Sequence, residues 1–126
     1  EAATSVINDQ EWLEGDFIKT VQQRGAAIIK ARGASSAASA ANAVVDSVAS
    51  VINPTPGGDT HSLCLCSDGS YGVDEGLISS FPTRNVGGQL EVVQGIQLDA
   101  FSQGKLDATV NELREEREMV RDLLPG

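Results

Sequence analysis

One helix-forming stretch, VQQRGAAIIKARGASSAASAANAVV at Val21–Val45, constrains the fold more than any other part of the chain. Alanine and serine dominate it, and Gly33 interrupts it once. Apolar side chains recur at helical spacing before the glycine, so we expect a helix from Asp16, as its cap, to about Arg32. Gly33 suits the left-handed residue that ends such a helix. Ser35 and Ser36 can then cap a second helix that ends near Val51.

The second expected helix has small side chains almost all round its first two turns, and bulky valines follow only later. A helix that packs only on its own core would carry one stripe of larger apolar side chains. Small side chains let another backbone or a ligand come close, so we expect this helix to contribute to a contact between two identical subunits. The alternatives are that alanine simply forms helix well within a tight helix pair, or that the free side meets another part of the same polypeptide.

The remaining pattern favours an α+β fold. Asn8 and Asp9 can cap a short helical turn that ends at Leu13. Alternation and turn residues then predict three short strands, with a loop at Asn85–Gly88 between the second and the third. A final helix follows, with Ser102 as its possible cap. The strands are Ser62–Ser67, Leu77–Pro82 and Gln89–Gly95, and the apolar stripe of the final helix is Leu106, Val110, Leu113, Val120 and Leu124. We therefore expect long helices packed on a small antiparallel sheet, with a C-terminal helix.

Composition excludes several classes of partner. The 126 residues carry a net charge of −9, which argues against nucleic acid and anionic membranes. Aromatic residues make up 4% of the chain, too few for a base-stacking platform. There is no apolar run of the roughly 18 residues that a membrane span needs, and no secretory signal. The chain begins at Glu1 without methionine, which is typical of a fragment or a processed product.

Cys64 and Cys66 occupy alternate positions of the first expected strand, so their side chains point to one face. A disulfide between them would be strained, and only His61 lies near enough to extend a metal site, so we expect no metal. We interpret the pair as reduced thiols packed on the strand, which fits a cytoplasmic location. His61 is interpreted as a surface residue at the start of that strand.

Four segments in order carry a family resemblance: VQQRGAAIIKAR with SSAASAANA, then SDGSYG, then EGLISSFP, and finally LREEREMVRDLL. The chain resembles the malate dehydrogenases of the cytosolic and bacterial type, within the lactate/malate dehydrogenase superfamily. The resemblance covers essentially the whole chain but only the C-terminal portion of such an enzyme. It implies that residues 1–126 form a substrate and dimerisation domain that is incomplete at its N-terminus, without the nucleotide-binding domain.

The resemblance also implies a chemistry. Intact enzymes of this kind interconvert malate and oxaloacetate by hydride transfer at the nicotinamide ring of NAD. The catalytic histidine, its aspartate and the substrate-binding arginines lie upstream of this chain, so we expect no catalytic residue here, His61 included. A serine of the motif lines the substrate pocket, and Ser35 takes that position. Ser39, four residues on, would share its helical face and lie near the nicotinamide.

Several alternatives stay open. Arg24 and Arg32 could clamp a dicarboxylate, but we favour ion pairs with acidic residues or contact with an absent domain. The whole protein could be a lactate or other 2-hydroxyacid dehydrogenase, or the chain could be a non-catalytic interaction module. No glycine-rich G-x-G-x-x-G turn follows an expected strand. We therefore expect the isolated chain to bind no NAD and to show no activity, and the preference for NAD over NADP is not written in it.

Overall fold

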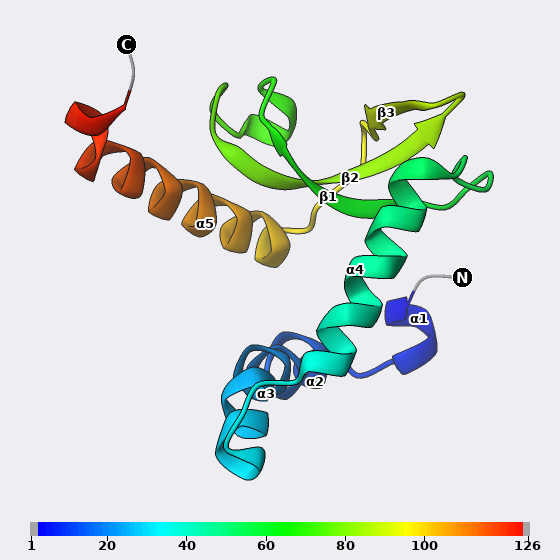
Figure 1. Cartoon of the computed structure of the whole chain (residues 1–126), viewed down its shortest axis with the longest axis vertical. Helices are drawn as coiled ribbons and strands as arrows, with labels where there is room; N and C mark the ends of the chain where they lie inside the picture. The colour runs from blue at the N-terminus through cyan, green and yellow to red at the C-terminus, as the bar shows by residue number, and fades with distance from the viewer. Residues whose placement is uncertain (1–2, 125–126) are drawn as a thin grey trace. The chain divides into compact units, whose positions relative to one another are not determined.

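The computed structural model describes residues 3–124, which divide into two compact units between Val45 and Asp46. The first unit holds three helices, and a fourth helix runs from the first unit into the second (Figure 1). The second unit holds a sheet, two 3-10 turns and a long C-terminal helix. The elements are α1 (Ala3–Ile7), α2 (Gln10–Glu14), α3 (Asp16–Arg32), α4 (Ala37–Ile52), β1 (His61–Cys66), η1 (Ser70–Gly72), β2 (Ile78–Val86), β3 (Gln89–Val92), α5 (Ala100–Met119) and η2 (Arg121–Leu123).

Local signals explain the helices of the first unit. The side chain of Asp9 accepts a hydrogen bond from the Trp12 amide and caps α2, as predicted. Gly33 has a φ of 72° and its amide donates to the Ile29 carbonyl, so it ends α3 in the expected left-handed conformation. The prediction that Asp16 caps α3 is wrong by one residue, because Asp16 is already helical and Gly15 precedes the helix.

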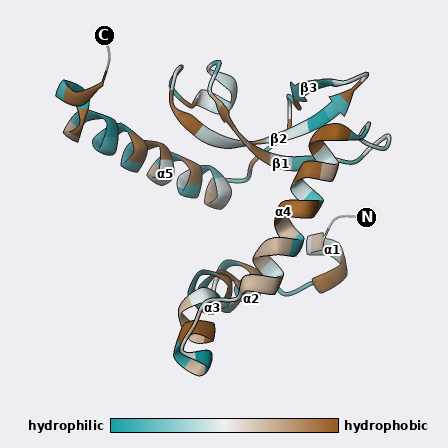
Figure 2. Cartoon of the chain, viewed as in Figure 1, coloured by the Kyte–Doolittle hydropathy of each residue, from teal (hydrophilic) through white to brown (hydrophobic). Residues whose placement is uncertain are grey.

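The first unit has almost no interior. Among residues 3–45 none is buried, and apolar side chains of α3 stay in the open, with Val21 58% and Ile29 50% exposed. In α4, too, no residue is buried, although Figure 2 shows hydrophobic turns along this helix. Most of a helix's stability in a protein comes from burying its apolar face. The apolar faces of α3 and α4 are therefore left uncovered within the described residues.

The second unit is built on a three-stranded antiparallel sheet in the order β1-β2-β3. This confirms the predicted sheet, although most strand boundaries differ from the predicted ones: β1 lies one residue earlier, at His61–Cys66, and β2 begins one residue later, at Ile78. The loop predicted at Asn85–Gly88 is wrong in its first two residues, because β2 continues to Val86 and pairs with β3. The third strand is shorter than predicted and ends at Val92, and Gly95 beyond it takes a φ of 81° that extended strands do not adopt.

The core of the second unit lies between the sheet and α5. Its buried apolar residues are Val73, Leu77, Phe81 and Val110, with Leu106 and Leu113 packed against them. Three residues of the predicted stripe thus face the core, whereas Val120 and Leu124 lie beyond the end of α5 and are exposed. The predicted cap Ser102 is also wrong. Asp99 caps α5 by accepting the Ser102 amide at 2.7 Å, and this hydrogen bond lowers the pKa of the Asp99 carboxyl.

Candidate functional site

Ser35 lies where the sequence predicts, at the joint between α3 and α4. It is exposed, and its carbonyl accepts a hydrogen bond from the Arg32 guanidinium at 3.4 Å. Its hydroxyl has no hydrogen-bond partner among residues 3–124, so the group is free to meet a ligand. Ser36, the last residue before α4, directs its hydroxyl to that of Ser39. The hydroxyl of Ser39 is therefore already engaged, while that of Ser35 is open.

Ser35 and Ser39 do not belong to one helix, so the prediction that they share a helical face is wrong. Ser39 lies in α4, which begins only at Ala37, and Ser35 precedes it. The physical reason is the left-handed turn at Gly33, after which residues 34–36 connect the helices without helical pairing. The roles expected for the two serines stay predictions.

The two candidate clamps of the first unit do not form a site within the described part of the chain. Arg24 is exposed on α3, and the favoured ion pair with an acidic side chain is not made by any described residue. Arg32 donates a hydrogen bond to the Ser35 carbonyl and forms no ion pair with a residue between 3 and 124. An exposed guanidinium costs little without a partner, because water solvates it.

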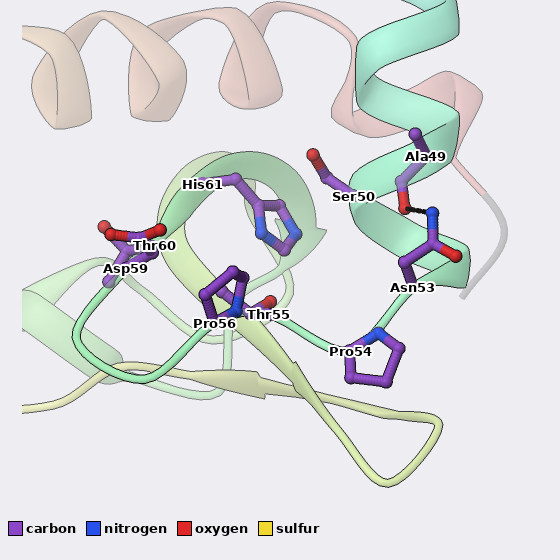
Figure 3. Close-up of a pocket in the computed structure, with 9 residues that line it drawn as sticks. All are labelled: Ala49, Ser50, Asn53, Pro54, Thr55, Pro56, Asp59, Thr60 and His61. Carbon is purple, nitrogen blue, oxygen red and sulfur yellow. Dashed lines mark hydrogen bonds between the residues drawn. The ribbon is translucent and has the colours of Figure 1, made fainter.

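His61 lies in a pocket of the second unit, of about 400 Å³, at the C-terminal end of α4 (Figure 3). Its ring stands between Ser50 and the loop that carries Thr55 and Pro56. The prediction of a surface residue is only partly right, because His61 is half-buried and its Nε2 atom is buried without a hydrogen-bond partner in the described structure. Asp59 also lines the pocket, but within the described residues no hydrogen bond or ion pair joins its carboxylate to His61, so the partner that a catalytic histidine needs is missing.

Cys64 and Cys66 lie on one face of β1, as predicted, and both are free thiols. The expectation that they are packed is wrong, because both are exposed while Leu63 and Leu65 take the inner face. Alternation along a strand sends every second side chain outward, and α5 packs on the other face. Within residues 3–124 no three His, Cys, Asp or Glu side chains gather into a group that could hold a metal ion.

Sequence reasoning missed an ion-pair cluster that ties α5 to the loop before β2. Asp74 accepts hydrogen bonds from two atoms of the Arg114 guanidinium, one at 3.0 Å, and Arg117 lies 3.4 Å from the same carboxylate. Arg114 chiefly, with Arg117, lowers the pKa of the Asp74 carboxyl. A further ion pair joins Glu118 and Arg121 at 3.0 Å, near the C-terminal end of α5.

Sequence reasoning also missed Asn85, which it assigns to a loop. The side chain is buried, donates to the Val51 carbonyl at the end of α4, and accepts the Gly88 amide at 2.9 Å. Its backbone exchanges hydrogen bonds with Thr55. An asparagine followed by Val-Gly-Gly signals a turn but not these distant contacts.

The described residues do not fit a bound dinucleotide. A pyrophosphate needs a glycine-rich turn between a strand and the N-terminus of a helix. Gly87 and Gly88, with φ of 61° and 89°, instead make the hairpin between β2 and β3. The N-terminus of α5 is occupied by the Asp99 carboxylate, which would repel a phosphate. None of the helices described between residues 3 and 124 is long and apolar enough to cross a membrane.

Comparison with known proteins defines the class. Residues 1–123 match the family model of the lactate/malate dehydrogenase alpha/beta C-terminal domain, so the chain belongs to this family. More particularly, it is 57% identical over 122 residues to a malate dehydrogenase of Magnetococcus marinus, covering 96% of this chain. It spans 37% of the length of that relative. The chain thus corresponds to a C-terminal fragment of a malate dehydrogenase-type enzyme.

Solved structures agree with this assignment. The malate dehydrogenase of Naegleria fowleri matches with a TM-score of 0.84 and 42% identity, over 94% of this chain and 36% of that one. The lactate dehydrogenase of Trichomonas vaginalis, in complex with NADH and oxamate, matches with a TM-score of 0.81 and 28% identity, over 90% of this chain and 35% of that one. The fold is therefore that of the C-terminal domain in both kinds of enzyme, and the higher identity is to malate dehydrogenases.

Proposed function

We propose that the chain is the substrate-side portion of an NAD-dependent malate dehydrogenase, and that the whole protein interconverts malate and oxaloacetate by hydride transfer in the cytoplasm. The 57% identity to a malate dehydrogenase over nearly the whole chain is the observation that carries this proposal. NAD as the cofactor is supported by the lactate dehydrogenase neighbour that was solved with NADH. Residues 1–126 form its substrate and dimerisation domain, and the nucleotide-binding domain lies outside them.

In this proposal Ser35 is a substrate-binding residue. Its exposed hydroxyl, without a partner among the described residues, can donate to a carboxylate or carbonyl oxygen of the substrate. Ser35 follows the left-handed Gly33 and lies outside both α3 and α4. A hydrogen bond from its hydroxyl to the substrate would therefore not compete with the backbone hydrogen bonds of a helix. Ser39 is proposed to lie near the nicotinamide, with its hydroxyl oriented by Ser36.

The chain by itself is proposed to be inactive. It carries no pyrophosphate cradle, and the single histidine lacks a carboxylate partner among residues 3–124. An assay of malate oxidation and oxaloacetate reduction with the purified 126-residue chain should give only background, and turnover by the pure chain would contradict the proposal.

The complete protein should use malate in strong preference to lactate. A preference for lactate would favour the other branch of the family, and no turnover of any 2-hydroxyacid would favour an interaction module.

Replacement of Ser35 tests the substrate role within the complete enzyme. Ser35→Ala removes a hydroxyl and little volume, so the Michaelis constant for malate or the turnover number should worsen while the melting temperature changes little. Loss of a cap alone would instead cost about 0.5–2 kcal/mol of stability with unchanged kinetics. Ser62→Ala, at an exposed serine of β1, is the matched control and should leave kinetics unchanged. Unaltered kinetic constants in Ser35→Ala would remove Ser35 from the site.

A further inference from the structure

The outer face of β1 presents two thiols that the proposed function does not use. Cys64 and Cys66 are exposed and free, and they occupy alternate positions of the strand. Ser62 lies next along the same face, and Ser80 of β2 lies directly opposite Cys64. Since β1 is an edge strand of the described sheet, the pair can be approached both from the face and from the side.

The spacing suits a bridging atom better than a direct sulfur–sulfur bond. Two residues of an extended strand span about 6.7 Å between Cα atoms, at the far end of the range that disulfides accept. A metal ion bound linearly by two thiolates, with bonds of about 2.3 Å each, needs the sulfur atoms about 4.6 Å apart. Staggered χ1 rotamers that lean the side chains toward each other along the strand can supply this separation without bending the backbone.

We propose that Cys64 and Cys66 form a two-coordinate site for a soft monovalent metal ion, with Cu(I) as its probe. Thiolates select soft ions such as Cu(I). A tetrahedral zinc site needs three or four protein ligands, and no such group exists within residues 3–124. On binding, two S–H bonds give way to two Cu–S bonds, and two protons leave to water. The oxidation state of copper stays +1, and the chain's net charge of −9 favours a cation.

The test uses the complete protein that contains this chain, reduced and kept free of oxygen. Cu(I) is supplied as a complex with the chromophoric chelator bicinchoninate, and its transfer to the protein is followed by absorbance. The natural protein should take up one ion per subunit more than the double variant Cys64→Ser/Cys66→Ser. Each single variant should bind that ion roughly 100-fold more weakly, because it loses the advantage of two linked ligands.

Two further variants keep the number of thiols constant. Cys66→Ser/Ser62→Cys keeps two thiols two residues apart on the same face, and should retain the site. Cys66→Ser/Thr60→Cys places the thiols about 13 Å apart in an extended chain, and should lose it. Equal affinity of the natural protein and either single variant would overturn the proposal, and so would retention of the site in the Thr60 variant. The proposal would also be overturned if neither thiol reacted with an aromatic disulfide reagent in the folded protein, because the pair would then be inaccessible.

Discussion

At the scale of single residues, Asn85 connects three parts of the second unit. Its amide donates to the Val51 carbonyl, 34 residues away in the chain, and its oxygen accepts the Gly88 amide. Asn85→Ala would remove both hydrogen bonds of a buried side chain and leave the half-buried Val51 carbonyl without this partner, whereas the exposed Gly88 amide can turn to water. We expect a loss of roughly 1–3 kcal/mol in the free energy of unfolding, measured by urea denaturation of the complete protein.

Asn111→Ala is the control for this prediction. Asn111 is an exposed asparagine on α5 that accepts one hydrogen bond from Arg114, so its loss should change stability by no more than about 0.5 kcal/mol. If both variants lost a similar amount of unfolding free energy, the buried position and the hydrogen bonds of Asn85 would not stabilise the fold more than those of an exposed asparagine.

Asp74 gives a prediction about pH. Hydrogen bonding to Arg114 lowers the pKa of its carboxyl in the folded state, so its contribution to stability is present above the ordinary aspartate pKa of about 3.9. That contribution is lost as the pH falls through the lowered pKa. The stability difference between the natural protein and Asp74→Asn should therefore be constant near neutral pH and shrink in acid, as followed by denaturation at a series of pH values.

Removal of the partner provides the check on Asp74. The loss of stability caused by Arg114→Gln should also shrink in acid. The double variant should lose less unfolding free energy than the sum of the two single variants, because the two residues act as a pair. Strict additivity would show that the ion pair stabilises nothing.

At the scale of elements, α5 is held by one central contact. Val110 is 4% exposed and packs against Val73, Leu77 and Phe81. Val110→Ala should cost about 2–3 kcal/mol of unfolding free energy, through lost burial and the cavity that remains. Val120→Ala, beyond the end of the same helix and 41% exposed, should cost less than about 1 kcal/mol. Equal costs, measured by chemical denaturation, would show that α5 is not anchored at Val110.

At the scale of the whole molecule, the two units should differ in stability. The first has no buried side chain among residues 3–45, whereas the second has a core. In the isolated chain, hydrogen exchange should be slow for the paired amides of β1 and β2 and fast throughout α3. The exposed apolar side chains of α3 should also promote aggregation. Slow exchange in α3 of a monomeric chain would contradict this prediction.

The small side chains at the start of α4 lead to a prediction about assembly. We propose a homodimer in which the small-residue turns of α4 meet a second subunit. Ala41→Trp in the complete protein should then shift the mass measured by light scattering toward the monomer, while circular dichroism shows a folded chain. Ala108→Trp, at an exposed alanine of α5, is the matched control and should leave the dimer intact. If bulk at Ala38, Ala41 and Asn42 in turn leaves the dimer unchanged, the contact lies elsewhere.

Local sequence signals specify the elements whose causes lie within a few residues. The periodicity of α3, the left-handed Gly33 and the Asp9 cap act over one helical turn, so local reasoning found them. It also located Ser35 at the joint between α3 and α4, and the alternation that puts Cys64 and Cys66 on one face.

Features that depend on partners far away in the chain are fixed by tertiary contacts. β2 runs on to Val86 because β3 pairs with it, and Asn85 is buried because α4 ends beside it. Asp74 is paired because Arg114, 40 residues later, reaches it. Whether the two cysteines are packed or exposed depended on which face of the sheet α5 covers. These outcomes follow from contacts between segments far apart in the chain, which no local pattern specifies.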